Sequence, residues 1–276
     1  MDPTEAFRQD VQDRVQRNAS DQELTQATTA FMTASIRAKY SYNFQWLSRP
    51  VIQYPQDIVA MQELVWHIRP DLIIETGVAH GGSVILSASL LALLDYSDAA
   101  ANGTMLDIRT SKRKVVGIDI DIRPHNRTAL QSHPLARLIT LVEGSSIDEA
   151  VVEKVRGLAS TATRVLVILD SNHTHEHVLA ELRAYAPLVT IDSYCVVFDT
   201  VIERLASTSF SDRPWDVGNN PMTAVDAYLS TLGRGATGAD GRPLAFKIDD
   251  AMDSRLQISV APRGYLRRIP SNAAAR

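Results

Sequence analysis

The segment "VLVILDSNHTHEHV" (165–178) carries the densest set of residues in this sequence that could do chemistry. Five apolar residues lead to Asp170, and His173, His175 and His177 follow at every second position. A carboxylate at this point is a natural ligand for Mg²⁺, and His173 could take the proton of a substrate hydroxyl as a general base. Three interpretations are open: a metal site, a catalytic base beside a carboxylate, or a strand that runs into a polar helix cap.

A second carboxylate, Asp199, ends the apolar run "SYCVVFDT" and favours the first interpretation. If the two runs form neighbouring strands, Asp170 and Asp199 make an oxygen-ligand pair for Mg²⁺. A single carboxylate that caps a loop is the alternative. Zinc is less favoured because the H-E-x-x-H arrangement and any well-placed cysteine are missing. We therefore expect His175 and His177 to be solvated helix residues.

The segment "ETGVAHGGS" (75–83) predicts a ligand-binding turn between a strand and a helix. Its glycines let the backbone approach a ligand, and the helix that follows offers free N–H groups. The spacing is G-x-x-x-G-G, with Glu75 two residues before Gly77, and not the G-x-G-x-x-G of dinucleotide sites. This pattern suits S-adenosylmethionine, which has no pyrophosphate but has an ammonium group that an acid attracts. The alternative is a plain tight turn.

Two further runs end in polar residues with roles in binding a nucleoside. Asp119, at the end of "GIDID", could hydrogen-bond both ribose hydroxyls, whereas Asp121 could face solvent. In "EGSSID", Ser145 and Ser146 could contact the adenine edge or cap the next helix. Capping is the favoured role for Ser146.

The elements that must position these residues alternate regularly from Asp71 onward. The apolar runs are short, continuous and β-branched, as in strands buried on both faces of a parallel sheet with helices between them. They cover residues 72–77, 114–121, 138–146, 164–171 and 193–200. The sequence therefore predicts a doubly wound α/β fold with a mostly parallel sheet. Ligands of such folds bind beyond the carboxyl ends of the strands, where the candidate residues lie.

Smaller elements are expected before and after this alternation. We expect residues 1–55 to form a helical arm and an aromatic lid, and residues 56–276 to form the main domain. The aromatic residues near position 45 could line a pocket or only pack over the core. After the alternation we expect a loop from residue 209, a helix around Met222 to Leu232, another loop, and a closing pair of strands at 244–250 and 256–269.

Composition limits the possible partners and compartment. The chain has 276 residues, 45% of them hydrophobic, a net charge of −4 and no cluster of basic residues, so nucleic acid and anionic membranes are not expected partners. Its one cysteine, Cys195, excludes an internal disulfide and fits a reducing compartment. The N-terminal segment lacks an apolar h-region and no apolar run reaches the length of a membrane span, so we expect a cytoplasmic protein.

Several long motifs carry a family resemblance: "YSYNFQWLSRPVIQYPQDIVAMQELVW", "PDLIIETGVAHGGS", "LDSNHTHEHVLAELRAYAPLV" and "GNNPMTAVDAYL". From about Tyr40 to Arg268 the chain resembles the cephalosporin hydroxylase/rhamnosyl O-methyltransferase family. The resemblance implies a Rossmann-like, S-adenosylmethionine-dependent methyltransferase domain over residues 56–276, a homo-oligomer, and a divalent metal beside the methyl donor.

The resemblance also implies roles for residues. The methionine part of the cofactor would bind to Glu75, Gly77, Ala79, Gly81, Gly82 and Ser83. The ribose would bind to Asp119, and Ser145 and Asp170 would complete the cofactor site. Asp170 and Asp199 would be metal ligands, with His173 as the base.

One position departs from the family pattern. Where related sequences tend to have Glu-Asp after the fifth strand, this chain has Phe198-Asp199. Water or Asn220 could complete the metal shell, or the metal could be lost. We expect methyl transfer to a hydroxyl of a deoxysugar such as rhamnose on a secondary metabolite. The alternatives are a component of cephalosporin 7α-hydroxylation/methoxylation and a non-catalytic cofactor-binding subunit.

Overall fold

The structure, a computed structural model, describes residues 2–205, 212–232 and 235–271. Its centre is a seven-stranded sheet in the order β5-β4-β3-β6-β7-β9-β8. The strands β3 to β7 are parallel, and β8 and β9 are antiparallel at one edge, which confirms the predicted sheet and its closing strand pair. The strands are β3 (Leu72–Thr76), β4 (Lys114–Asp119), β5 (Ile139–Glu143), β6 (Val165–Leu169), β7 (Tyr194–Val197), β8 (Phe246–Ile248) and β9 (Tyr265–Arg268).

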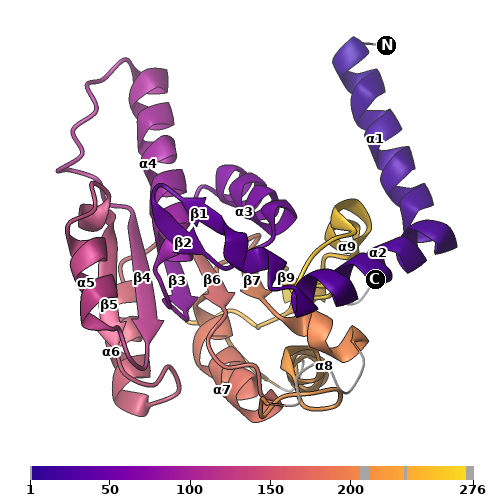
Figure 1. The fold of residues 1–276 in the computed structure, drawn as a ribbon. Coiled ribbons are helices and arrows are strands. Elements are labelled where there is room, and N and C mark those ends of the chain that lie inside the picture. Colours follow the sequence, from indigo (N-terminus) through magenta and orange to yellow (C-terminus); the bar gives the residue numbers. More distant parts are fainter. Residues whose placement is uncertain (1, 206–211, 233–234, 272–276) are drawn as a thin grey trace.

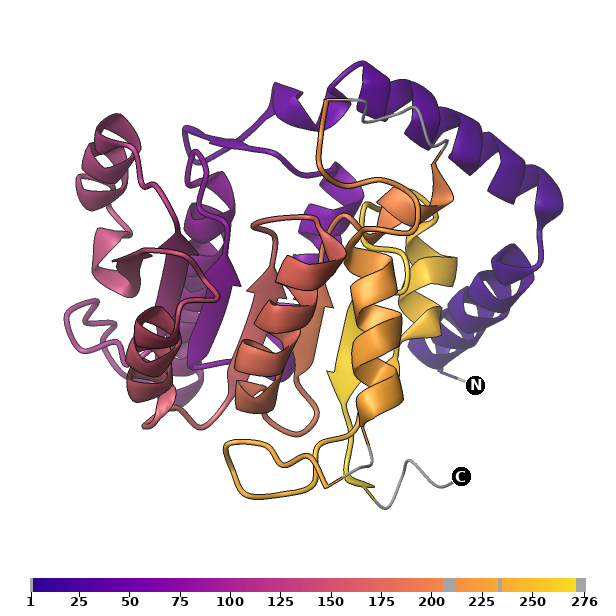
Figure 2. The same cartoon turned by 90° about the horizontal axis from the view of Figure 1, so that it is seen from below.

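Helices cover both faces of this sheet (Figure 1). One face carries α3 (Pro55–Ile68) and α4 (Gly82–Asn102), with α5 (Pro124–Gln131) towards the β5 edge. The other face carries α6 (Glu149–Ala159), α7 (His175–Tyr185) and α8 (Pro221–Thr231), which lie side by side in Figure 2. The short helix α9 (Asp250–Leu256) joins β8 to β9.

The strand β6 illustrates why continuous apolar runs form this sheet. All five of its residues are buried. Leu166 and Ile168 belong to the core beneath α3 and α4, whereas Val165, Val167 and Leu169 belong to the core beneath α6 and α7. Because neighbouring side chains point to opposite faces, a strand with helices on both sides has no face exposed to water.

The N-terminal segment consists of two helices and a hairpin. The arm helices α1 (Pro3–Ala19) and α2 (Gln22–Arg37) precede β1 (Phe44–Trp46) and β2 (Arg49–Val51), and α1 points away from the main body in Figure 1. The hairpin packs over the start of α4, and Trp46 Nε1 donates to Ser89 Oγ at 2.9 Å. Tyr54 is buried, and its hydroxyl lies 2.7 Å from Ser35 Oγ of α2. This segment is therefore a packed lid, tied to both the arm and the sheet domain.

The second predicted closing strand, at 256–269, is present but shorter than expected. Residues Tyr265–Arg268 pair as β9, and α9 ends at Leu256. The intervening chain contains Pro262 and Gly264, which interrupt a ladder, and its backbone bonds to Asp57 instead. The predicted helix around Met222 is confirmed as α8. The first residues of the loop predicted before it, 209–211, and residues 233–234 of the loop predicted after it, lie outside the described residues.

Within the described ranges, α4 is the helix that is long and apolar enough to cross a membrane. Most of its large apolar residues are instead buried between the sheet, α3 and the lid, whereas Leu93 and Tyr96 are exposed. We therefore assign α4 as the core helix of the sheet domain.

Candidate functional site

The carboxyl ends of β6 and β7 bring the predicted metal and base residues together. The two strands are neighbours, so Asp170 and Asp199 follow adjacent strand ends as expected. Ligand atoms of Asp170, His173 and Asp199 all lie within 4.8 Å of one another. His173 Nε2 is 3.1 Å from Asp199 Oδ2. The structure thus groups two carboxylates and one imidazole at the edge where ligands of such sheets bind.

The loop before α8 reaches over His173. The rings of His173 and Trp215 meet edge to face, with their centroids 4.7 Å apart. Asn219 anchors this loop to α7, because its Oδ1 accepts a hydrogen bond from the His175 backbone N–H at 3.0 Å. Within the described part of the chain, this loop thus lies over His173. The imidazole of His173 is held between an aromatic edge and a carboxylate.

Asp170 sits in an unfavourable electrostatic environment. Burial raises the pKa of Asp170 well above its usual value, and the nearby carboxylates of Asp199 and Glu75 raise it further. Like charges this close cannot all remain ionised in a low-dielectric site unless a cation joins them. The donor set, two carboxylates with room for water, is the one that Mg²⁺ prefers. The residues present therefore fit a divalent hard cation.

The glycine loop after β3 needs its glycines for close approach. A side chain at Gly77, which has a φ of +89°, would place its first carbon 2.0 Å from the backbone oxygen of Asp170. A side chain at Gly82 would meet the backbone oxygen of Pro50 in the lid at 2.1 Å. These two glycines allow the loop to pass between the β6 end and the lid. The α4 N-terminus that follows has no side-chain cap, so its backbone N–H groups are available to an anion.

Asp119 holds the same loop from the end of β4. Its Oδ2 accepts hydrogen bonds from the backbone N–H groups of Val78 at 2.8 Å and Ala79 at 3.0 Å. Its Oδ1 accepts one further bond, from Asp121 N at 3.2 Å. A carboxylate has about four acceptor positions, so one remains for a ribose hydroxyl. Asp121 itself is exposed, as expected.

A small, partly open cavity lies between Glu75, Asp170 and the lid. Its volume is about 20 Å³, the space of a single water molecule or ammonium group. Glu75 is 1% exposed, and burial raises its pKa to about 7, although the hydroxyls of Ser83 and Ser87 act in the opposite direction. Ser87 donates to Glu75 Oε2 at 3.1 Å, and Glu75 Oε1 has no hydrogen-bond partner among the described residues.

Gln53 completes this cavity, although no motif in the sequence selects it. Its Nε2 donates to Asp170 Oδ2 at 3.1 Å, and its Oε1 is buried with no partner in the described part of the chain. Two unpartnered acceptors, Gln53 Oε1 and Glu75 Oε1, therefore belong to residues that line one small cavity, which a second carboxylate, Asp170, also lines. Such a cavity suits a group with several N–H donors. The only signal in the sequence was its place beside the aromatic lid.

Phe198 and Asn220 bear on the predicted metal shell. Phe198 is 3% exposed, lines the same cavity and offers no ligand atom. Asn220 does not replace the missing acid, because its Oδ1 caps α8 and its Nδ2 donates to Glu203 and to the backbone oxygen of Asp216. Of the options raised by the sequence, Asn220 is thus ruled out, and completion of the shell by water and loss of the metal both stay predictions.

Three other predictions were wrong: Ser146 as a helix cap, and His175 and His177 as solvated helix residues. Ser146 does not cap α6, whose N-cap residue is Asp148. Its hydroxyl instead contacts His177 and Glu181 of α7. His175 is not solvated either, since its Nδ1 lies 2.8 Å from Thr223 Oγ1 of α8. These contacts join segments far apart in the sequence, so no local pattern indicates them. Ser145, by contrast, stays half-buried at the end of β5.

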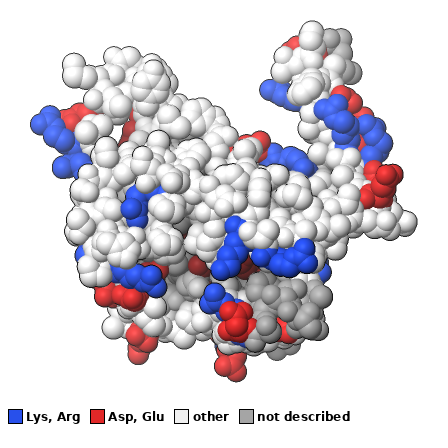
Figure 3. Space-filling model, viewed as in Figure 1, with Lys and Arg blue, Asp and Glu red and all other residues white. Residues whose placement is uncertain are grey.

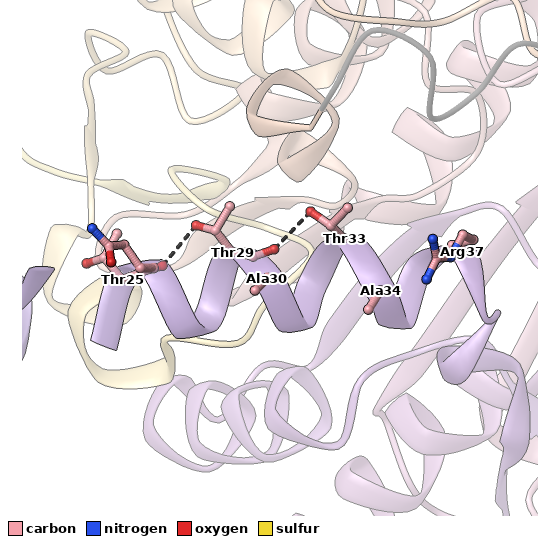
Figure 4. Close-up of a pocket in the computed structure, with 7 residues that line it drawn as sticks. Thr25, Thr29, Ala30, Thr33, Ala34 and Arg37 are labelled. Carbon is pink, nitrogen blue, oxygen red and sulfur yellow. Dashed lines mark hydrogen bonds between the residues drawn. The ribbon is translucent and has the colours of Figure 1, made fainter. Parts of the chain in front are cut away.

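A further hollow on the surface of the described residues is unrelated to this site. It is an open depression of about 470 Å³ along α2, lined by Thr25, Gln26, Thr29, Ala30, Thr33, Ala34 and Arg37 (Figure 4). The hydroxyls of Thr29 and Thr33 donate to backbone oxygens of their own helix. Arg37 is the single titratable residue among those that line it, so the hollow has no set of groups for catalysis.

The sheet order, the glycine loop and the carboxylates at the strand ends define the class: a Rossmann-like methyltransferase. A solved structure of CmcI with Mg and SAM has this fold, with a TM-score of 0.51 and 18% identity over 83% of this chain and 77% of that one. The family model of Rhamnosyl O-methyltransferase/CmcI matches residues 38–269, and the chain belongs to this family. The predicted resemblance is thus confirmed.

Curated relatives carry the same family name. A rhamnosyl O-methyltransferase of Mycobacterium tuberculosis is 27% identical over 216 residues, which cover 77% of this chain and 73% of the relative. One from Mycobacterium leprae is 25% identical over 224 residues, covering 81% and 82%. This chain is accordingly classed with the S-adenosylmethionine-dependent O-methyltransferases.

Proposed function

We propose that this protein transfers the methyl group of S-adenosylmethionine to a hydroxyl of a deoxysugar, such as rhamnose, on a secondary metabolite. The observation that carries the proposal is the grouping of Asp170, His173 and Asp199 within 4.8 Å beside the glycine loop. The names of the curated relatives support a rhamnosyl hydroxyl as the acceptor.

The cofactor fits the residues around the loop. The methionine ammonium group would fill the cavity between Glu75, Gln53 and Asp170, where its N–H donors meet the unpartnered acceptors. The methionine carboxylate suits the uncapped N-terminus of α4, which includes Gly82 and Ser83. These features support Glu75, Gly77, Ala79, Gly81, Gly82 and Ser83 as residues around the methionine part, with Asp119 at the ribose and Ser145 towards the adenine.

Asp170 and Asp199 would hold Mg²⁺, with waters in place of the acid that Phe198 replaces. The ion would supply positive charge that lowers the pKa of the acceptor hydroxyl. His173 faces Asp199 through Nε2, which leaves Nδ1 to accept the hydroxyl proton. Trp215 fixes the ring for this transfer. The remaining requirement is to align the acceptor oxygen with the methyl–sulfur bond, and the loop before α8 is placed to shield it from water.

A methyl-transfer assay tests this function. Labelled S-adenosylmethionine would be offered with rhamnosides or with a 7-hydroxylated cephalosporin, in Mg²⁺ or in chelator. We expect Mg²⁺-dependent label on the sugar, and at least a 100-fold loss of turnover in His173→Ala with unchanged cofactor affinity. Label on the cephalosporin alone would contradict the sugar assignment. Cofactor binding without transfer to either acceptor would favour a non-catalytic subunit.

Three further features stay predictions: a homo-oligomer, a cytoplasmic location and a division of the chain near residue 55.

The charge pattern agrees with a small-molecule acceptor. On the face shown in Figure 3, the basic and acidic residues that the structure describes are interspersed. A continuous basic surface of the kind that binds nucleic acid is not seen on that face.

A further inference from the structure

Most of the polar residues in "LDSNHTHEHVLAEL" have no place in the proposed chemistry. Asp170 and His173 face the reaction site, but Ser171, His177 and Glu181 of the same motif lie together elsewhere. Glu181 Oε1 accepts a hydrogen bond from Ser171 Oγ at 2.6 Å and a second from Ser146 Oγ at 2.6 Å. His177 Nε2 lies 3.0 Å from Ser146 Oγ and 3.3 Å from Ser171 Oγ. We call these four residues the Glu181 cluster.

The cluster joins two loops whose strands are not neighbours. Ser146 follows β5 and Ser171 follows β6, and β4 and β3 lie between these strands in the sheet. With about 4.8 Å between adjacent strands, β5 and β6 are about 14 Å apart. Both loops nevertheless reach one carboxylate oxygen of Glu181. They therefore close together over the ends of β3 and β4, where the glycine loop and Asp119 are.

The hydrogen atoms of the cluster can be assigned. Both serine hydroxyls donate to Glu181 Oε1, so their oxygens can only accept from His177. His177 Nε2 therefore carries a hydrogen, and its Nδ1 has no partner within the described ranges. The Tyr185 hydroxyl also donates to the backbone oxygen of Ser146. Each serine is thus held from several sides.

The burial of the Glu181 carboxylate is unfavourable for folding. It is 0% exposed, and its Oε2 has no hydrogen-bond partner among the described residues. A buried carboxylate with one unsatisfied oxygen destabilises a fold, so packing alone gives no reason for it. An apolar side chain of the same length on α7 would fill the space at lower cost. The cluster is better explained by a requirement to hold the two loops in one arrangement.

The surroundings indicate which part of the cofactor these loops meet. If Asp119 binds the ribose, the base must extend from the end of β4 towards the end of β5. Two large apolar side chains are exposed there, Ile120 directly after Asp119 at 73% and Ile147 directly after Ser146 at 41%. Exposed isoleucines at neighbouring strand ends offer apolar contact to a flat purine ring. The position of Ile147 depends on Ser146, which Glu181 holds.

We propose that Glu181 is a positioning residue for the adenine end of the methyl-donor site. It fixes the loops after β5 and β6 through Ser146 and Ser171, and it does not touch the reacting atoms. This proposal rests on the proposed function, because it requires that the site binds S-adenosylmethionine.

The test compares three substitutions of glutamate on α7. Glu181→Leu keeps the bulk and removes the acceptor, whereas Glu181→Gln keeps a neutral acceptor for both serines. Glu176→Gln changes an exposed glutamate of the same helix and is the control. For each, calorimetry would give the Kd of S-adenosylmethionine and of 5′-methylthioadenosine, which has the adenosine half and lacks the amino-acid part. Turnover would be measured at saturating cofactor, and folding by the thermal midpoint.

For Glu181→Leu we expect both Kd values to rise about tenfold, with turnover at saturation within about twofold of wild type. Glu181→Gln should restore both Kd values to within about threefold, and Glu176→Gln should match wild type. If Glu181→Leu does not fold, the double variant Ser146→Ala/Ser171→Ala carries the same expectation. Unchanged Kd values, or a loss confined to turnover, would overturn the positioning role. If wild type itself binds neither ligand, the proposed function fails instead.

Discussion

Two sets of buried carboxylates in this protein differ in whether the protein itself supplies their hydrogen-bond donors. Asp57 is 0% exposed, and its oxygens accept hydrogen bonds from Ser259 Oγ at 2.6 Å, Val260 N at 3.0 Å and the Tyr265 hydroxyl at 3.0 Å. Glu75 and Asp170 lie near one small cavity, where Glu75 keeps an unpartnered oxygen and Asp170 faces other carboxylates.

The contrast separates an architectural carboxylate from a binding one. Asp57 is satisfied by the protein itself and fastens α3 to the segment before β9, so it needs no ligand. Glu75 and Asp170 destabilise the fold until a ligand with positive charge or several N–H donors binds beside them. Removing a carboxylate should therefore affect stability in the first region and function in the second.

The largest expected effect is from Asp170→Asn. The amide keeps the shape but cannot serve as an anionic metal ligand, so turnover should fall at least 100-fold. Since Asp170 is held near other carboxylates, the folded chain should be as stable as wild type or more stable. Steady-state kinetics and thermal unfolding measure the two quantities. A variant that loses stability and keeps its turnover would reverse the assignment of this region.

The contribution of Asp57 should appear in the pH dependence of the free energy of unfolding. Burial raises the pKa of Asp57 from 3.8 to about 6 in the folded chain. A raised folded pKa stabilises the fold below the unfolded value of 3.8, and this contribution is lost as the pH rises through 6. The free energy of unfolding of wild type should thus fall by about 3 kcal/mol relative to that of Asp57→Asn between pH 3.5 and 7. Urea unfolding of both proteins in chelator measures it, and parallel pH curves would contradict the role of this group.

Glu75→Gln should have a smaller effect, on cofactor affinity. A hydrogen bond to a charged partner contributes about 1.5 to 3 kcal/mol, so the Kd of S-adenosylmethionine should rise at least tenfold. Glu143→Gln, which removes an exposed partner of Arg127, serves as the matched control. Equal affinities of the two variants would mean that the ammonium group binds elsewhere.

The smallest effect is expected from Phe198→Glu. This substitution restores an acid at the position where the family pattern has one. A third carboxylate should tighten Mg²⁺ binding several-fold, at some cost in stability because Phe198 is buried. Calorimetric titration of Mg²⁺ checks this. A weaker Mg²⁺ affinity in a folded variant would count against Asp170 and Asp199 as the ligands.

The sequence predicted the sheet well because the inner parallel strands β3, β6 and β7 are short runs buried on both faces, which leaves a local pattern. It also placed Asp170, His173 and Asp199 at one edge, since parallel strands of one sheet end together. Gln53 could not be found in this way. Its bond to Asp170 joins positions 117 residues apart, and nothing in its own segment indicates the partner.

The wrong predictions have the same origin. Ser146 was expected to cap a helix and His177 to face water, because each sits at a helix start in the sequence. Their partner Glu181 lies on α7: it is four residues from His177 on the same helix, whereas Ser146 reaches it from the loop after β5. The predicted strand at 256–269 is shortened to Tyr265–Arg268, and before it the backbone N–H of Val260 donates to Asp57, about 200 residues earlier.

The most direct test of the account is calorimetric titration of S-adenosylmethionine into chelator-treated protein, with and without added Mg²⁺. We predict one binding site per chain with micromolar affinity in both conditions, because Glu75, Gln53 and Asp119 bind the cofactor and the metal acts on the acceptor. No binding in either condition would contradict the methyl-donor site, and with it the proposed function.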